Sequence, residues 1–403
     1  MVHVQVGIVG KPNAGKSTFY SAATLNNVAI ANYPFTTIKP SHGIAYLRTQ
    51  CVCRSLGVHD SPRNSKCIDG ERFIPVDLVD LPGLVPGASE GRGLGNQFLD
   101  EVRKADALIH VVDASGSTDA EGKLVTMGTH DPREDMKFLN EEVELWILQL
   151  LKKEWDKITR RPDLSVEDLV QAISERLSGL GVKRSHIENS LEHENLPPKP
   201  SQWSNEDLHR LVSSLRKGSK PVLVAANKID LPSSPPNIEK LRNSETMTIP
   251  VCAEAELALR KASEKGLVGY KPGDATFLTK EGVVLTPEQE AALEMISQRV
   301  LKPYGNTGVQ DCINEAFFRL LDMIVVYPVE DPEKMTDHSG NILPDAFLVQ
   351  KGTNLGQLAL KIHKELGESF LYGFNAKDGM RLGEAYILKN GDVVSIVSAA
   401  RRR

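Results

Sequence analysis

Apolar runs recur along the first part of the chain and are separated by segments with helical periodicity. Short apolar runs bounded by glycine or polar residues predict β-strands, and strands that alternate with helices indicate a mostly parallel sheet covered by helices. We therefore expect a doubly wound α/β domain. The four predicted strands lie in VQVGIVG, RFIPVDLVDL, DALIHVVDAS and PVLVAANKID.

A long stretch between the third and fourth of these strands breaks the alternation. Its apolar residues recur at three- and four-residue spacing, which is typical of one face of a helix. We predict a helical insertion over residues 119–218 with a small core of its own. The residues that carry this periodicity are Leu139, Val143, Trp146, Ile147, Leu150 and Leu151.

The pattern changes again near residue 320. A helical connector, TPEQEAALEMISQRVLKPYG, precedes it, and after it strand-like segments flank the helical LGQLALKIHKELG. This order predicts a small sheet crossed by one helix. The predicted organisation is a sheet domain over 1–118 and 219–319, the second part including the connector, the helical insertion over 119–218, and a small C-terminal domain over 320–403.

Composition narrows the class of protein without identifying it. The 403 residues carry a net charge of −5, which gives no electrostatic reason to expect DNA binding. No apolar run approaches the roughly 20 residues of a membrane helix, and the start of the chain does not resemble a signal peptide. The five cysteines are an odd number. Together these features predict a cytoplasmic protein with reduced thiols and no membrane partner.

The first candidate site follows the first predicted strand and precedes a predicted helix. Its spacing, Gly10-x4-Gly15-Lys16-Ser17, is typical of a phosphate-binding loop, in which backbone N–H groups and the helix N-terminus wrap a phosphate chain. Lys16 is expected to reach the outer phosphates, and Ser17 to bind Mg²⁺. The predicted nucleotide-binding residues of this loop are Gly10, Lys11, Pro12, Asn13, Ala14, Gly15, Lys16, Ser17 and Thr18.

Two further motifs follow later predicted strands in the order that a nucleotide site requires. Asp80-Leu81-Pro82-Gly83 offers a second Mg²⁺ contact through Asp80 and a backbone amide for the outermost phosphate at Gly83. The segment Asn227-Lys228-Ile229-Asp230 can read a base, because the carboxylate of Asp230 accepts two hydrogen bonds from guanine that adenine cannot donate. The predicted ligand is GTP bound to a P-loop NTPase fold.

These motifs resemble the Obg-related GTPases, particularly the YchF-like members and their archaeal relatives. The resemblance rests on GKPNAGKSTF, NYPFTTIKP, the segment that begins DLPGLVPG, and NKID. The C-terminal segments resemble a TGS domain, a β-grasp module, and the helical insertion is similar in placement to the coiled-coil arm of that family. The resemblance implies a ribosome- or translation-associated switch, with the ribosome or RNA as partner.

The same resemblance assigns further residues. Thr37 matches the threonine that completes Mg²⁺ coordination, and Thr36 is the alternative in a shifted register. Cys252 and Ala253 lie in a loop that resembles the guanine-contacting loop, with cysteine in place of the usual serine. YchF-type members commonly have an altered base-recognition motif and accept ATP. The intact NKID here favours GTP.

The resemblance also bears on hydrolysis. Leu84 follows Gly83 at the position where Ras-like enzymes carry the glutamine that orients water, so intrinsic turnover is expected to be slow. Asn13 matches an asparagine that helps bind K⁺ in related GTPases; the alternative is that it only bonds within its loop. The predicted catalytic residues are Lys16, Asn13, Thr37 and Gly83, and the predicted metal ligands are Ser17, Thr37 and Asp80.

Two questions stay open at this level. A nucleotide-dependent stress-signalling protein with incidental hydrolysis, or a YchF-type ATPase, is an alternative to the translation switch. Cys51, Cys53 and Cys67, with His59 between them, contain metal-binding residue types, but their spacing is not a standard zinc pattern, and all four fall in a segment that resembles a loop. Free thiols are therefore the favoured interpretation.

Overall fold

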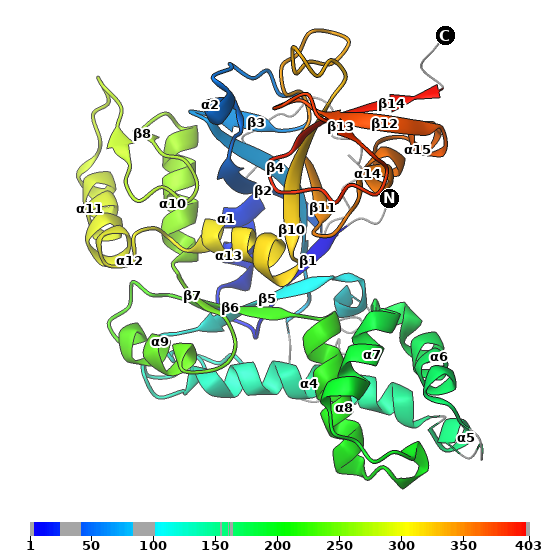
Figure 1. Cartoon of the computed structure of the whole chain (residues 1–403). Coiled ribbons are helices and arrows are strands. Elements are labelled where there is room, and N and C mark those ends of the chain that lie inside the picture. The colour runs from blue at the N-terminus through cyan, green and yellow to red at the C-terminus, as the bar shows by residue number, and fades with distance from the viewer. Residues whose placement is uncertain are drawn as a thin grey trace.

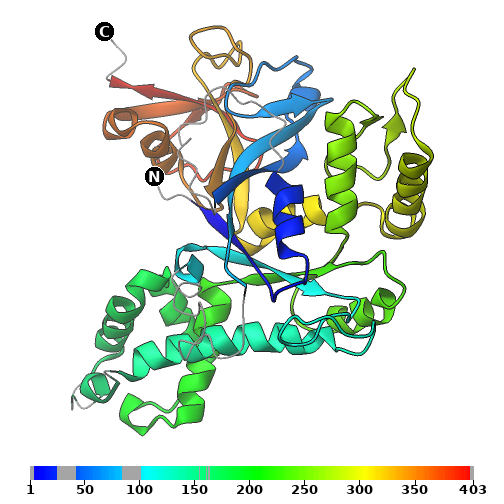
Figure 2. The same cartoon turned by 180° about the vertical axis from the view of Figure 1, so that it is seen from behind.

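The structure is a computed structural model that describes residues 4–24, 42–83, 101–153, 155–159, 161 and 164–399. Thr36, Thr37 and Leu84 therefore lie outside the described residues, and their predicted roles stay predictions. Figures 1 and 2 show a central sheet with the helical segment on one side and the small C-terminal domain on the other. No helix within the described ranges combines the length and the apolar character needed to cross a membrane.

The central sheet has the order β2-β4-β1-β5-β6-β7, with β3 paired to β4. The pairs β4–β1, β1–β5 and β5–β6 join the four predicted strands and are parallel, as the sequence predicted. The pair β6–β7 is also parallel, although β7 was not predicted, whereas β2 and β3 pair with β4 in antiparallel fashion. The long antiparallel strand β2 was not among the predicted strands. The strands are β1 (Gln5–Val9), β2 (His42–Gln50), β3 (Lys66–Ile68), β4 (Glu71–Asp80), β5 (Ala107–Asp113), β6 (Val222–Asn227) and β7 (Thr248–Val251).

Both faces of this sheet are buried, which explains why its parallel strands read as continuous apolar runs. Along β5, Ile109 and Val111 pack on the side that carries α1 and α13, whereas Leu108 packs on the side that carries α4 and α8. Every residue of β5 is buried. The helices that belong to this domain are α1 (Lys16–Thr24), α9 (Ser234–Arg242), α10 (Ala253–Glu264) and α13 (Val309–Glu315).

The segment between β5 and β6 is helical, as predicted. Its first and last helices lie under the sheet (Figure 1), and Trp155 stacks on Trp203 farther out, with ring centroids 5.3 Å apart. The prediction of a separate core was wrong, because Leu139 and Leu211 belong to the same buried cluster as Leu108 of the sheet. The helices are α4 (Pro132–Lys152), α5 (Trp155–Thr159), α6 (Val166–Leu177), α7 (Arg184–His193) and α8 (Asn205–Ser219).

The predicted connector forms a helix that begins directly after Thr286, its N-cap residue. The Thr286 side chain accepts a hydrogen bond from the Gln289 backbone, and Gln289 reaches back to the Thr286 N–H, which satisfies two otherwise unpaired groups. The connector contains α11 (Pro287–Ile296) and α12 (Lys302–Tyr304), and a two-stranded hairpin of β8 (Val268–Gly269) and β9 (Leu278–Thr279) precedes it.

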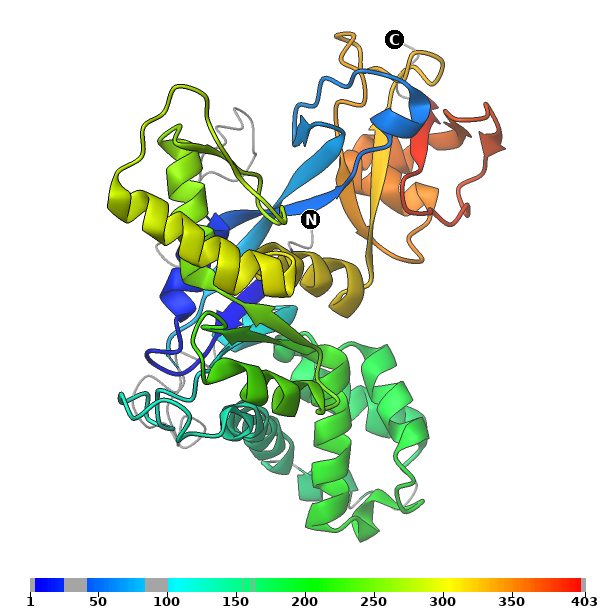
Figure 3. The same ribbon diagram turned by 90° about the vertical axis from the view of Figure 1, so that its left-hand side faces the viewer.

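The C-terminal domain is a five-stranded sheet in the order β11-β10-β14-β12-β13, with β10 and β14 parallel at its centre. Helix α14 packs on one face, as the sequence predicted for a helix across a small sheet. Figure 3 shows this sheet beside the end of the central sheet that carries β2 and β3. Its elements are β10 (Met323–Val329), β11 (Phe347–Gln350), α14 (Leu355–Ile362), α15 (Lys364–Glu368), β12 (Phe370–Asn375), β13 (Arg381–Leu382) and β14 (Val393–Ser398).

Strand β10 shows how the two domains are joined. Its alternate residues point to opposite faces: Ile324 and Val326 pack under α14, whereas Val325 and Tyr327 join the buried cluster that contains Ile8 and Leu47 of the central sheet. One strand therefore contributes to the core of its own domain and to the contact between domains. The small sheet is packed against the central-sheet domain along one face.

Candidate nucleotide-binding site

A cavity of about 440 Å³ opens where the phosphate-loop segment, the NKID segment and the start of α10 meet. It brings the phosphate-loop segment together with two segments that lie more than 200 residues farther along the sequence. Gly10, Ala14 and Ala253 were predicted nucleotide contacts but do not line it, whereas Leu231 and Glu254, which the sequence did not single out, do. The lining residues are Lys11, Pro12, Asn13, Gly15, Lys16, Ser17, Thr18, Asn227, Lys228, Asp230, Leu231, Cys252 and Glu254.

The phosphate-loop segment turns sharply between the end of β1 and the start of α1. Gly15 has φ +95°, and a Cβ there would lie 2.2 Å from Nδ2 of Asn227. At Gly10 a Cβ would lie 2.5 Å from the backbone oxygen of Val111. Both contacts are too close for any side chain. The backbone geometry therefore requires glycine at both positions of the motif. Gly10 does not contact the cavity, but it allows the loop to adopt its shape.

Lys16 lines one end of the cavity and pairs with Asp80, which is a predicted metal ligand but does not itself line the cavity. The Nζ of Lys16 is 2.5 Å from Oδ1 of Asp80, and both side chains are only partly buried. Asp80 is the last residue of β4 and aligns with Ile8 of β1. Parallel pairing of these two strands thus places the carboxylate next to the loop that follows β1. Gly83, three residues on, approaches Pro12 of the same loop.

Asn227 joins two loops of the site. Its Nδ2 donates a hydrogen bond to the backbone oxygen of Ala14, and its Oδ1 accepts one from the backbone N–H of Ala253. The side chain is buried, so both bonds are protected from water. Asn227 and Ala253 therefore act here as a brace that fixes the phosphate-loop segment relative to α10.

Lys228 is anchored by an acidic residue that the sequence analysis did not single out. Its Nζ donates to Oδ2 of Asp113, which is fully buried at the end of β5 and also accepts from Ser115, Ser117 and Thr118. Burial alone would raise the pKa of Asp113, but the hydrogen bonds from Ser115 and Lys228 lower it below its usual value. A carboxylate at the end of a strand that is apolar except for His110 was the available signal.

Asp230 lies at the other end of the cavity beside Cys252. The Cys252 thiol donates to Oδ1 of Asp230 across 3.2 Å. Burial, and then the charge of Asp230, raises the pKa of Cys252, so the sulfur keeps its proton and remains a donor. A serine hydroxyl would make the same contact. Glu254, in the first turn of α10, adds a second carboxylate to this end.

Two residues of the phosphate-loop segment have side-chain partners outside the cavity. The Nζ of Lys11 is buried against Asp135 of α4, 2.8 Å from Oδ2, and also donates to the backbone oxygen of Thr118. Its ammonium group is therefore not offered to a phosphate. Asn13 has φ +61°, and its Nδ2 donates to the backbone oxygen of Gly122. The sequence left open that Asn13 bonds only within the phosphate loop. In the structure its side chain instead bonds to the segment that contains Gly122.

Comparison with known proteins agrees with this geometry. Residues 5–147 match the family described as 50S ribosome-binding GTPase, residues 225–331 match the Obg-like GTPase YGR210-like, G4 motif-containing domain, and residues 339–398 match the TGS domain. These matches include the phosphate-loop segment, the base-reading segment and most of the C-terminal sheet.

Individual relatives cover nearly the whole chain. The uncharacterized GTP-binding protein MJ1332 of Methanocaldococcus jannaschii is 50% identical over 398 residues, which is 98% of this chain and 99% of the relative. The crystal structure of a GTP binding protein from Pyrococcus horikoshii OT3 has 40% identity and a TM-score of 0.77, and covers 98% of this chain and 100% of that one. The ribosome-binding ATPase YchF of Bacillus subtilis is 31% identical over 275 residues, 64% of this chain and 68% of that protein. The chain therefore belongs to the Obg-related, YchF-like GTPases that carry a C-terminal TGS domain.

Proposed function

We propose that this protein is a Mg²⁺-dependent enzyme that hydrolyses GTP to GDP and phosphate and acts as a cytoplasmic, ribosome-associated switch. One observation carries the proposal: a single cavity has Lys16 and Ser17 at the phosphate end and Asp230 at the other. A nucleoside triphosphate needs one end of the cavity for its phosphates and the other for its base. The two ends come from distant motifs that only the fold brings together.

The phosphate end fits a magnesium triphosphate. Ser17 and Asp80 offer the oxygen ligands that Mg²⁺ prefers, and Thr37 is a third predicted ligand outside the described residues. Bound Mg²⁺ would offset negative charge on the phosphates. Lys16 now pairs with Asp80, and a bound nucleotide would let its ammonium group contact the outer phosphates instead. The backbone amide at Gly83 would hold the third phosphate and lose this contact after hydrolysis.

The base end favours guanine. Cys252 donates to one oxygen of Asp230 and thereby helps to orient the carboxylate. Guanine can donate two hydrogen bonds to such a carboxylate, whereas adenine lacks that pair of donors. A YchF-type ATPase is the second candidate, because the Bacillus subtilis relative is named an ATPase.

A nucleotide titration separates the two candidates. The purified full chain in Mg²⁺ buffer is expected to bind GTP at least roughly 100-fold more tightly than ATP. Asp230→Asn should lose this preference and gain affinity for xanthosine triphosphate, whose 2-oxo group accepts a hydrogen bond from the asparagine amide. Glu239→Gln, at an exposed position on α9, is the matched control. Equal or tighter ATP binding by the unchanged protein would overturn the guanine assignment.

Hydrolysis and its setting need separate measurements. Asn13 is held by Gly122, and its amide oxygen is the atom that a potassium ion would take. We expect faster GTP turnover in K⁺ than in Na⁺ buffer, and identical rates would exclude the potassium role.

Cosedimentation with ribosomes, compared between GDP and a non-hydrolysable GTP analogue, tests the switch. Absence of ribosome binding in both states would favour the stress-signalling alternative.

A further inference from the structure

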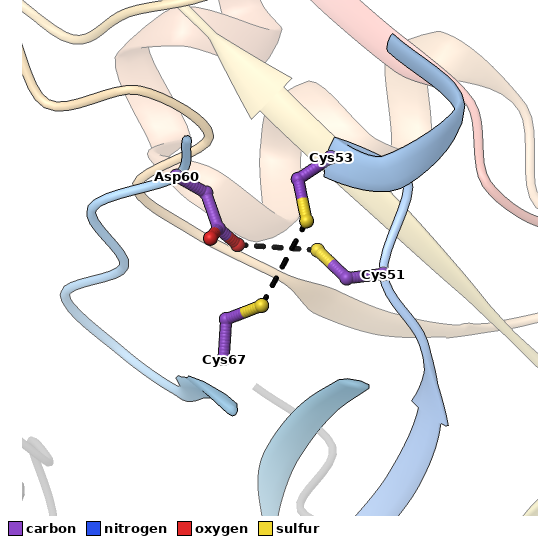
Figure 4. A group of neighbouring side chains, drawn as sticks. All are labelled: Cys51, Cys53, Asp60 and Cys67. Carbon is purple, nitrogen blue, oxygen red and sulfur yellow. Dashed lines mark hydrogen bonds between the residues drawn. The ribbon is translucent and has the colours of Figure 1, made fainter. Parts of the chain in front are cut away.

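Three cysteines and one aspartate meet far from the nucleotide cavity. Cys51 follows β2, Cys53 starts the short helix α2 (Cys53–Leu56), Asp60 lies in the next loop, and Cys67 is in the middle of β3. One ligand atom from each residue lies within 4.8 Å of the other three. Figure 4 shows the three sulfurs and the carboxylate pointing into one common space.

This arrangement corrects the sequence-based picture of the segment. It contains a helical turn and a strand rather than one loop, and the fourth polar group is Asp60 instead of His59. All five cysteines of the chain lie in the described residues, and they are free thiols. The fold thus collects three of the five thiols at one point, although their spacing in sequence matches no standard motif.

The distances suit one metal ion. The sulfurs of Cys53 and Cys67 are 3.8 Å apart, far longer than the roughly 2.05 Å of a disulfide. Zinc bound to thiolates has bonds of about 2.3 Å, so two tetrahedral sulfur ligands are about 3.8 Å apart. Oδ2 of Asp60 is 3.1 Å from the sulfur of Cys51. Ligand atoms this close leave room for a single ion and exclude a cluster of several metals.

The residue types select the metal. Three thiolates form a soft donor set, which favours zinc over Mg²⁺ or Ca²⁺, and four protein ligands close the coordination of a structural zinc ion. Cys51 and Cys53 are buried, with 2% and 6% of their surface exposed. Cys67 and Asp60 are intermediate in exposure. Two of the four ligands are thus closed to water, which suits a structural ion better than a catalytic one.

A second layer of contacts supports these ligands. The backbone N–H of Cys53 donates to the sulfur of Cys51. Arg72 is fully buried, and its Nη2 lies 3.3 Å from Oδ2 of Asp60. Three thiolates and a carboxylate carry four negative charges; a divalent ion offsets two of them, and Arg72 offsets a third. Partners of this kind orient ligands in known metal sites.

The cluster also lies at the contact between domains. The same Arg72 guanidinium donates to the backbone oxygen of Leu343 and stacks over the ring of Tyr327, both in the C-terminal part of the chain. Next to the cluster, the backbone N–H groups of Ser61 and Arg63 donate to the backbone oxygens of Ile342 and Pro344. An ion that fixes segment 51–70 therefore also fixes the surface on which the C-terminal domain rests.

We propose that Cys51, Cys53, Asp60 and Cys67 bind one zinc ion, which fastens segment 51–70 and the C-terminal domain to the edge of the central sheet. On binding, the three thiols and any protonated carboxylate lose their protons to solvent, and zinc takes their place. No electrons are transferred. The site is independent of nucleotide binding.

Metal analysis of the full chain tests this proposal. The protein is expressed in zinc-supplemented medium, purified without chelator and measured by elemental mass spectrometry. One zinc per chain is expected. Exchange for Co²⁺ should give the visible absorption of a tetrahedral ion and thiolate-to-metal charge transfer in the near ultraviolet. Both Cys53→Ser and Cys67→Ser should weaken zinc affinity by roughly 100-fold or more, since each removes a ligand.

Controls separate loss of the site from loss of the fold. Cys312→Ala removes a buried thiol outside the cluster and should keep the zinc. Asp60→Asn keeps the side-chain volume and should keep the fold while weakening zinc binding. All variants are checked by circular dichroism. A folded wild-type protein without zinc that also fails to take up Co²⁺ would overturn the proposal, as would full zinc content in folded Cys67→Ser. GTP binding, measured in parallel, is expected to stay unchanged.

Discussion

The nucleotide cavity and the cysteine cluster are two sites built on the same sheet by different means. The cavity collects residues that directly follow parallel strands, and the carboxyl ends of such strands meet at one edge. The cluster collects residues around the start of β4, where β2 and β3 both pair with it in antiparallel fashion. The first arrangement has a sequence signature with fixed spacing, whereas the second depends on how one irregular segment folds back. The comparison shows that a site becomes readable in sequence when a regular topology fixes its position.

The two regions also differ in what surrounds them. The cavity is open to a ligand, and its charged groups pair with one another, as Lys16 does with Asp80. The cluster is closed: its cysteines are largely buried, and the neighbouring cation, Arg72, is fully buried and reaches the other domain. An open site with exchangeable pairs suits a ligand that is bound and released. A closed site suits an ion that stays bound.

The largest expected effect comes from Gly15→Val. At φ +95° a β-branched residue is strained by about 1–3 kcal/mol, and its Cβ would displace Asn227, which braces two loops of the cavity. We expect GTP affinity to fall by roughly 1000-fold, the sum of strain and lost bonds, with zinc content unchanged. Isothermal titration calorimetry and metal analysis measure the two effects.

The control for this change is Gly282→Val. Gly282 also has positive φ, but nothing lies within 4 Å of its Cβ position. This variant therefore carries the strain without the contact with Asn227 and should bind GTP normally. Equal loss of affinity in both variants would show that strain alone, and not the brace, explains the result.

Arg72→Met tests the closed region. It leaves Asp60 without its buried cation and removes the bond to Leu343. Loss of one partner of a buried pair costs roughly 3 kcal/mol, so the free energy of unfolding in urea should fall by about that amount at constant zinc. GTP affinity should stay unchanged.

Arg63→Met provides the comparison for Arg72. Arg63 also bridges to the C-terminal part, at Asp337, but half of its surface is exposed. Exposed ion pairs contribute at most about 1 kcal/mol. If Arg63→Met destabilised the protein as much as Arg72→Met, burial would not be the reason for the larger effect.

Asp113→Asn sharpens the comparison within the cavity. The carboxylate holds Lys228 and three hydroxyl groups, and an amide nitrogen cannot accept their hydrogen bonds. We expect a loss of roughly 2 kcal/mol in unfolding free energy at pH 7 and weaker GTP binding, because the lysine of the base-reading segment loses its anchor. Asp119→Asn, at a more exposed turn, should have little effect.

The effect of Asp113→Asn should depend on pH. The pKa of Asp113 is lowered in the folded state, so its contribution to stability is fully present above the unfolded value of about 3.9 and is lost as the pH falls through the folded value. The stability difference between wild type and variant should therefore shrink below about pH 4 in denaturant titrations. A constant difference down to pH 2 would contradict a charged Asp113.

The smallest effect is expected for Cys252→Ser. A hydroxyl donates to Asp230 as the thiol does, so GTP affinity should change by less than about threefold. Zinc content should also stay constant, because Cys252 lies outside the cluster of Cys51, Cys53 and Cys67. A loss of zinc in this variant would mean that a different set of thiols holds the ion.

Much of the fold was predictable because its signals are local. The buried parallel strands read as apolar runs, and the connector helix begins directly after Thr286, a residue type that commonly caps helices. The strand β2 escaped prediction because its sequence, HGIAYLRTQ, mixes apolar and polar residues without a regular pattern, and pairing with β4 decides its conformation. The helical segment was recognised, but the sharing of its core with the sheet depends on contacts that periodicity cannot report.

The sequence by itself determined the phosphate-loop motif, the base-reading motif and their order, because each needs a few residue types at fixed spacing next to a strand. Only the tertiary structure decided that Asp113 anchors Lys228, that Lys11 binds Asp135, and that one face of β10 packs on the nucleotide domain. It also decided that three thiols and Asp60 share one space. These contacts join distant segments, and their energy comes from burial and charge pairing that exist only when the segments meet.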